Sequence, residues 1–144
     1  MKTETTLILL LFLFGCQPER PERKVYPVSR IIDGDTIVIS DSKRPITIRL
    51  LGIDCPERNE KGFDEARKFL IELLDSKSVY LEFDTIQPKY DRYGRTLAFV
   101  YRSSDNLFIN AEIIRAGMGM VFEEYPCKYT TELLELQNHH KAGQ

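Results

Sequence analysis

The hydrophobic period of the sequence changes at Phe63, and this change limits the folds that the chain can adopt. Before it, three β-rich runs lie in "VSRIIDGDTIVIS" and "PITIRLL", and Asp33-Gly34 has the place of a hairpin turn between the first two. From Phe63 to Leu74 the apolar residues recur at the spacing of one helical face. Two more β-rich runs follow, "SVYLEF" and "TLAFVY".

Five short strands with a helix between the third and the fourth are typical of a Greek-key barrel of the OB type. Two further helices are expected: one from Ile109 to Ala116, ended by Gly117, and one from about Thr131 to His140, capped by Thr130 or Thr131. The 144 residues are enough for one domain with a core. The sequence therefore predicts a single α+β domain, a five-stranded OB-fold barrel with three helices.

The N-terminal stretch is expected to lie outside this domain. An apolar run from Leu7 to Phe14 is too short to span a bilayer and suits the core of a signal peptide, residues 1–16. The residues before Cys16 resemble a bacterial lipobox, in which the cysteine is lipidated, and a plain signal peptide cleaved nearby is the alternative. Residues 17–27 would be a charged tether and residues 28–144 the folded domain. We expect export from a bacterial cell, followed by lipid anchoring to the envelope membrane or secretion.

Charged residues interrupt the apolar runs at three places. The net charge of −2 gives no overall basic field, so any site for a polyanion must be local. The three places are "DGDT" from residue 33, Arg49 with the carboxylates that follow it, and "DRYGR" from residue 91. An arginine in an apolar strand needs an acceptor, because a buried charge without a partner is costly.

These charges point to one chemistry when they are taken together. Carboxylates without clustered histidine or cysteine favour a hard cation such as Ca²⁺, with Asp35, Asp54 and a carbonyl near Cys55 as oxygen ligands. Arginines beside such a cation suggest a bound phosphate. A nearby carboxylate, Glu57, could take a proton from a water that attacks phosphorus. The combination describes metal-assisted phosphoryl transfer to water.

Each of these features also has an ordinary explanation. Asp33-Gly34 also fits a simple turn, and Arg49 with Glu57 fits a surface ion pair of little energetic consequence. Residues 91–95 also fit an ordinary loop before a strand. Their joint occurrence in one β-rich chain favours the chemical interpretation.

Three motifs, "IDGDTI", "IRLLGIDCPE" and "DRYGR", carry a resemblance to the staphylococcal nuclease-like, or thermonuclease, family. The resemblance runs from about Val28 to about Leu136. It implies an OB-fold barrel with three helices and a Ca²⁺-dependent phosphodiesterase that acts on DNA and RNA. Such an enzyme cuts on the 5′-oxygen side and leaves 3′-phosphate ends.

The resemblance also assigns roles to individual residues. It makes Asp35, Asp54 and the backbone carbonyl of Cys55 the calcium ligands. The catalytic residues that it implies are Arg49 and Arg95, which bind the scissile phosphate, and Glu57, the proposed general base.

The substrate-binding residues implied by the resemblance are Arg92, Tyr93 and Tyr125. Arg92 and Tyr93 would hold a neighbouring phosphate, and Tyr125 would line the base pocket. Stacking on an aromatic ring tolerates any base and suits single strands. A partly buried packing role is the alternative for Tyr125.

Some questions stay open at this level. Cys55 and Cys127 could form a disulfide in an exported protein, although their spacing cannot place them within bonding distance. We expect a monomeric nuclease. The alternatives are a non-catalytic OB-fold module that binds nucleic acid or protein and a structural envelope lipoprotein.

Overall fold

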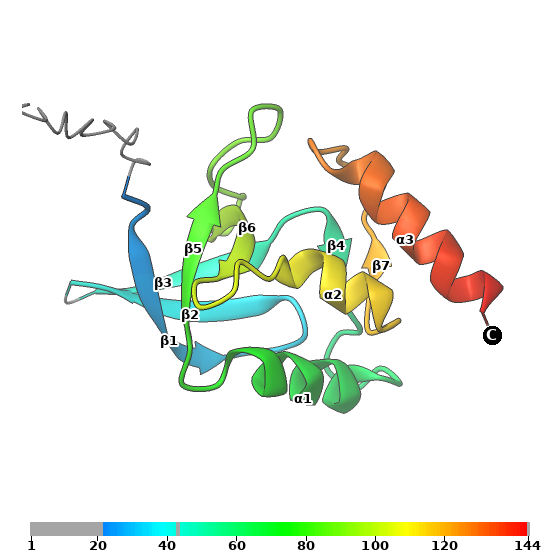
Figure 1. The fold of residues 1–144 in the computed structure, drawn as a ribbon, viewed down its shortest axis with the longest axis horizontal. Helices are drawn as coiled ribbons and strands as arrows, with labels where there is room; N and C mark the ends of the chain where they lie inside the picture. The colour runs from blue at the N-terminus through cyan, green and yellow to red at the C-terminus, as the bar shows by residue number, and fades with distance from the viewer. Residues whose placement is uncertain (1–21, 43, 144) are drawn as a thin grey trace, which may run out of the picture.

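The computed structural model describes residues 22–42 and 44–143 and has a barrel with helices packed around it (Figure 1). The predicted signal peptide and Cys16 lie outside the described residues. The elements in chain order are β1 (Val25–Ile31), β2 (Thr36–Asp41), β3 (Arg44–Leu50), β4 (Ile53–Asp54), α1 (Phe63–Leu74), β5 (Ser78–Glu82), β6 (Thr96–Arg102), α2 (Ile109–Arg115), β7 (Met120–Val121) and α3 (Thr130–Ala142).

Five strands close the barrel in the order β1-β2-β3-β6-β5, which confirms the predicted α+β barrel with three helices. β1 pairs with β5 through Val25–Pro27 and with β2 from Val28 onward, and a register shift between Val28 and Arg30 interrupts the pairing with β2. One irregular strand thus takes part in both pairings. β3 and β6 pair in parallel, and β4 and β7 form a small separate sheet that the sequence did not predict.

β1 begins at Val25, within the stretch that was assigned to the tether. Val25 pairs with Tyr80, and Pro27 pairs with Ser78. Residues 25–27 therefore belong to the barrel wall.

The core fills the barrel by the alternation of strand side chains. Ile37, Ile39, Ile48 and Leu50 are fully buried, while the residues between them face the other side of the wall. Burying one such side chain contributes about 1.5–3 kcal/mol to stability. The apolar face of α1, which includes Leu70, packs against this core, as its period predicted.

α2 and α3 pack against one another beside the barrel (Figure 1). Asn110 at the start of α2 is fully buried; its Oδ1 accepts from the Val100 N–H at 3.0 Å and its Nδ2 donates to the Leu51 carbonyl at 2.8 Å. α2 ends where Gly117 takes a left-handed conformation with φ of 68°, as its sequence position predicted.

The predicted threonine cap of α3 is wrong. Tyr129 is the N-cap and makes no side-chain capping bond. The Thr130 hydroxyl instead accepts a hydrogen bond from the Cys127 N–H at 2.8 Å, so it orders the turn before the helix. Within the described residues, none of the helices has the length and apolar character needed to cross a membrane.

Candidate active site

Arg49 brings the two candidate metal carboxylates together. Its Nη2 lies 3.1 Å from Asp35 Oδ2 and 2.8 Å from Asp54 Oδ1. Its Nη1 donates to the carbonyls of Leu50 at 2.9 Å and Ile53 at 2.8 Å. The arginine that the strand pattern marked as needing an acceptor therefore has four, and both carboxylates face one guanidinium.

The barrel register explains this meeting. Thr36 of β2 pairs with Arg49 of β3, so Asp35 stands at the end of the neighbouring strand. The chain then reverses at Gly52, whose φ of 78° is the left-handed conformation that glycine adopts easily. β4 follows at once and carries Asp54 back toward Arg49.

Asp35 and Asp54 differ in their surroundings. Asp35 is 5% exposed; it accepts from the Cys55 N–H at 2.8 Å and from the Thr36 hydroxyl at 3.1 Å. Burial raises the pKa of Asp35 to about 7, although the charge of Arg49 acts in the opposite direction. The Asp54 side chain is 51% exposed. One carboxylate is thus held in place by the barrel, and the other faces solvent.

The donor set fits a hard cation. Two carboxylates at one point, next to the main chain of Cys55, offer oxygen ligands of the kind that Ca²⁺ prefers. In residues 22–42 and 44–143 no three histidine, cysteine, aspartate or glutamate side chains gather in a way that could hold a metal ion. Main-chain carbonyls and water would have to complete the shell of about six to eight oxygens.

Glu57 follows Asp54 of β4 by three residues and is exposed to solvent. Its amide N–H donates to Glu60 Oε2 at 2.7 Å. The Glu57 residue is exposed, and no described residue makes a hydrogen bond or ion pair with its carboxylate. That carboxylate is therefore available to accept a proton.

Arg95 is held by Asp91 across a tight turn. Its Nε donates to Asp91 Oδ2 at 2.7 Å, and its N–H donates to Asp91 Oδ1 at 2.9 Å. Burial acts to raise the pKa of Asp91, but these hydrogen bonds outweigh it and the pKa is lowered. Arg49 pairs with Leu97 of β6, and Arg95 directly precedes that strand, so the two arginines are brought close to one another along the chain ends of β3 and β6.

The candidate substrate residues are exposed. Arg92 Nη2 donates to the Tyr93 hydroxyl at 2.7 Å, and the Arg92 guanidinium lies 4.8 Å from the Tyr93 ring centroid. Tyr93 is 68% exposed. Tyr125 is 54% exposed and touches Phe122 with ring centroids 5.6 Å apart, so most of its surface is open to contact.

The hypothesis of a Cys55–Cys127 disulfide needs correction, because both cysteines are free and buried. A Cβ on Gly34 or Gly119 would lie 3.0 or 2.8 Å from the Cys55 sulfur, whereas the Cys127 sulfur packs against Gly52. Burial raises the pKa of the Cys55 thiol. The two sulfurs thus fill different places in the packing, which their spacing in the sequence could not reveal.

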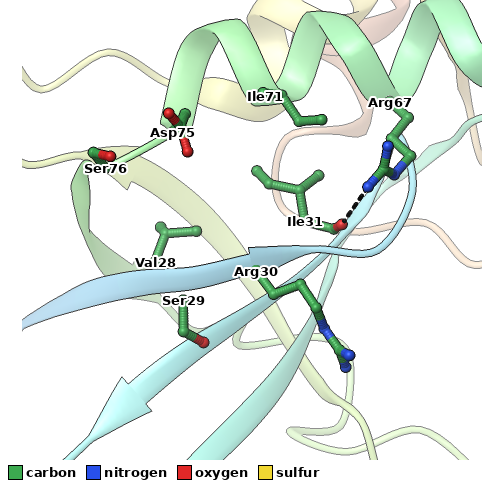
Figure 2. A pocket seen from close by; sticks show the side chains of 8 residues that line it. All are labelled: Val28, Ser29, Arg30, Ile31, Arg67, Ile71, Asp75 and Ser76. Atoms are coloured by element: carbon green, nitrogen blue, oxygen red, sulfur yellow. Dashed lines mark hydrogen bonds between the residues drawn. The ribbon is translucent and has the colours of Figure 1, made fainter.

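Arg67 of α1 is a residue that the sequence did not single out. Its Nε donates to the Ile32 carbonyl at 3.1 Å and its Nη2 to the Ile31 carbonyl at 3.5 Å, as Figure 2 shows in part. It clamps the end of β1 just before Asp33, whose Oδ1 accepts from the Asp35 N–H at 3.1 Å. The helical period places Arg67 off the apolar face, and no motif marks it.

A cavity of about 210 Å³ lies beside this clamp, between β1 and α1 (Figure 2). None of the predicted site residues lines it. This cavity is therefore separate from the candidate site.

Comparison with known proteins agrees with the family resemblance of the site motifs. The sequence matches the family described as "Staphylococcal nuclease homologue" over residues 47–144. It is 36% identical to an "Uncharacterized endonuclease" of Escherichia coli O157:H7 over 68% of this chain and 61% of that protein. It is 34% identical to one of Haemophilus influenzae over 83% of this chain and 64% of the relative.

A thermonuclease of Staphylococcus hyicus is 33% identical, over 67% of this chain and 58% of that protein. The chain thus spans less than two thirds of the length of these curated relatives. Together with the closed barrel, the matches support the expected family, and the chain belongs to the staphylococcal nuclease homologue family.

Proposed function

We propose that the protein is a Ca²⁺-dependent nuclease that hydrolyses phosphodiester bonds of DNA and RNA on the 5′-oxygen side and leaves 3′-phosphate ends. The observation that carries the proposal is the meeting of Asp35 and Asp54 at Arg49. The printed names of relatives, endonuclease and thermonuclease, support it.

In this proposal Asp35, Asp54 and the Cys55 carbonyl hold Ca²⁺. The bound ion would supply positive charge for an oxygen of the scissile phosphate. Asp35 is already oriented by the Cys55 N–H and the Thr36 hydroxyl, so one ligand needs little rearrangement.

The two arginines bind the phosphate. Arg95 is anchored to Asp91 through Nε, and no described residue bonds its two terminal nitrogens, so both can face phosphate oxygens. Arg49 shares its Nη2 between two carboxylates, so it would face the same phosphate once Ca²⁺ binds those carboxylates in its place.

Glu57 accepts a proton from the attacking water. The water oxygen forms a bond to phosphorus, the bond from phosphorus to the 5′-oxygen breaks, and the leaving oxygen takes a proton from solvent. The exposed, unpaired carboxylate of Glu57 suits this role because no other group competes for it among the described residues.

The substrate is proposed to be single-stranded by preference, with Arg92, Tyr93 and Tyr125 as its contacts and a monomer as the active form. The exposure of Tyr93 and Tyr125 supports stacking on unpaired bases. Light scattering during gel filtration would test the monomer.

An assay with and without Ca²⁺ tests the proposal. Purified protein should cleave single-stranded DNA and RNA in Ca²⁺, stop in excess EDTA, and leave ends that need phosphatase before a polymerase can extend them. Ca²⁺ should also raise the melting temperature of the wild type but not of Asp35→Asn, because a ligand that binds only the folded state stabilises it. Binding of nucleic acid without cleavage, unaffected by Ca²⁺, would instead support the non-catalytic OB-fold module.

Export and lipidation at Cys16 are a separate proposal that rests on the lipobox resemblance. Labelling of cells with a palmitate analogue should mark the wild type and not Cys16→Ala. An unlabelled wild type in the culture medium would favour a plain signal peptide.

A further inference from the structure

The segment between β5 and β6 exposes two aromatic rings that lie close to a lysine ammonium. Phe83 is 43% and Tyr90 is 56% exposed. Lys89 Nζ lies 4.7 Å from the Phe83 ring centroid and 5.6 Å from that of Tyr90. One ammonium thus lies within cation–π range of two open rings. We call Phe83, Lys89 and Tyr90 the outer platform.

Residues 83–95 carry three basic and two acidic side chains, a net charge of +1. Lys89 and Arg92 form no ion pair with any carboxylate of the described residues, whereas Asp91 is engaged by Arg95. Asp84 accepts hydrogen bonds from the backbone N–H groups of Thr85, Gln87 and Lys128. The acids of the segment are therefore occupied, and its cations are available to a polyanion.

The segment is tied down before any ligand arrives. Gln87 Nε2 donates to the Pro126 carbonyl at 2.7 Å, and Lys128 Nζ donates to Glu82 at 2.6 Å. Figure 1 shows the segment beside the start of α3, in agreement with these bonds. Binding to a surface that is already ordered loses less conformational entropy.

The outer platform is continuous with the proposed cleavage site. Tyr90 forms a bridge with Thr96, and the Lys89 carbonyl accepts from the Leu97 N–H at 2.9 Å. Leu97 is the β6 partner of Arg49. The platform thus lies next to the start of β6, which directly follows Arg95.

We propose that the outer platform binds the unpaired bases and phosphates of a single strand of nucleic acid where it runs past Tyr93, away from the bond that is cut. The inference rests on the proposed function and extends it to longer substrates. Phe83 and Tyr90 stack on bases, and Lys89 neutralises a phosphate. Bases in a duplex are already stacked on one another and cannot use these rings.

The test measures binding of the full-length protein to fluorescently labelled (dT)12 and (dT)3 by anisotropy, in EDTA so that cleavage does not interfere. The double variant Phe83→Ala/Tyr90→Ala should bind (dT)12 at least fivefold more weakly, since each base–aromatic stack contributes roughly fivefold to 150-fold. Binding of (dT)3, which is too short to reach past Tyr93, should stay unchanged. Lys89→Ala should reduce the slope of log K against log salt by about 0.7.

Ile86→Ala is the matched control. Ile86 lies in the same segment and is 65% exposed, but it has no ring, so its removal should not change binding. Equal melting temperatures of all variants show that folding is intact, as the exposure of these side chains leads us to expect.

The inference is overturned if the wild type does not bind (dT)12, if the double variant binds it as the wild type does, or if a 12-base-pair duplex loses as much affinity as the single strand. It stands, while the proposed activity falls, if the binding differences appear but Ca²⁺ produces no cleavage. If the protein cleaves in Ca²⁺ but all variants bind (dT)12 equally, the proposed activity stands and the inference about the outer platform falls.

Discussion

The Asp35–Arg49 pair of the candidate site and its aromatic residues differ in their exposure to solvent. Asp35 is 5% exposed and the Arg49 side chain 13%, and both are positioned by the pairing of two barrel strands. Tyr93 and Tyr125 are 68% and 54% exposed and lie on connecting segments. The barrel thus holds the charges whose positions must be accurate, while loops present the surface that a long, variable polymer would touch.

The largest effect is expected from Arg49→Ala, which removes a side chain of the buried part. Cleavage should fall at least about 100-fold, as for the loss of one transition-state donor. The free energy of unfolding should fall by roughly 2 kcal/mol, because Asp35 and Asp54 lose a shared partner and the carbonyls of Leu50 and Ile53 lose a donor. Kinetics and urea unfolding measure the two effects, and unchanged stability would erase the contrast between the two parts.

Glu57→Gln should separate chemistry from stability. The turnover number should fall by roughly 100-fold to 10,000-fold if Glu57 is the general base. The free energy of unfolding should stay within about 0.5 kcal/mol, because Glu57 is exposed. Glu65→Gln removes another exposed carboxylate on α1 and should leave the rate unchanged. A fully active Glu57→Gln protein would remove this residue from the mechanism.

Tyr93→Ala should affect only the exposed part, and so substrate binding and not stability. We expect KM for single-stranded substrates to rise about fivefold to tenfold, with little change in the melting temperature. Tyr93→Phe keeps the ring and loses the hydroxyl that accepts from Arg92, so it distinguishes stacking from the hydrogen bond. A loss of stability in Tyr93→Ala would show that the loop contributes to the fold as well.

The smallest effect is expected from Asp91→Asn. Asp91 binds Arg95 and directly precedes Arg92 and Tyr93, so it connects the two parts. The pKa of Asp91 is lowered, so its stabilising contribution is present above the ordinary value of 3.8 and is lost as the pH falls through the lower, folded-state value. The variant should be less stable by about 1 kcal/mol at pH 7, and the difference should disappear at pH values well below 3.8. Urea unfolding across this pH range measures it, and a gap independent of pH would exclude the ionised carboxylate as the cause.

The elements with a long, regular pattern were predictable. The alternation in β2 and β3 and the apolar face of α1 specify burial directly, so the barrel and its helices agree with the sequence. The prediction of a threonine cap for α3 was wrong because the Thr130 hydroxyl accepts a hydrogen bond from the Cys127 N–H instead. The disulfide failed because spacing along the chain says nothing about the distance between two sulfurs.

The sequence by itself determined where charged residues interrupt the apolar strands, at Asp35, Arg49 and Asp54, and an arginine in such a strand must find an acceptor. Only the tertiary structure decided that Asp35 is buried and Asp54 exposed, that one guanidinium joins them, and that Arg67 clamps the chain before them. The physical reason is that exposure and hydrogen-bond geometry depend on strand register and on residues distant in sequence, such as the pairing of Arg49 with both Thr36 and Leu97.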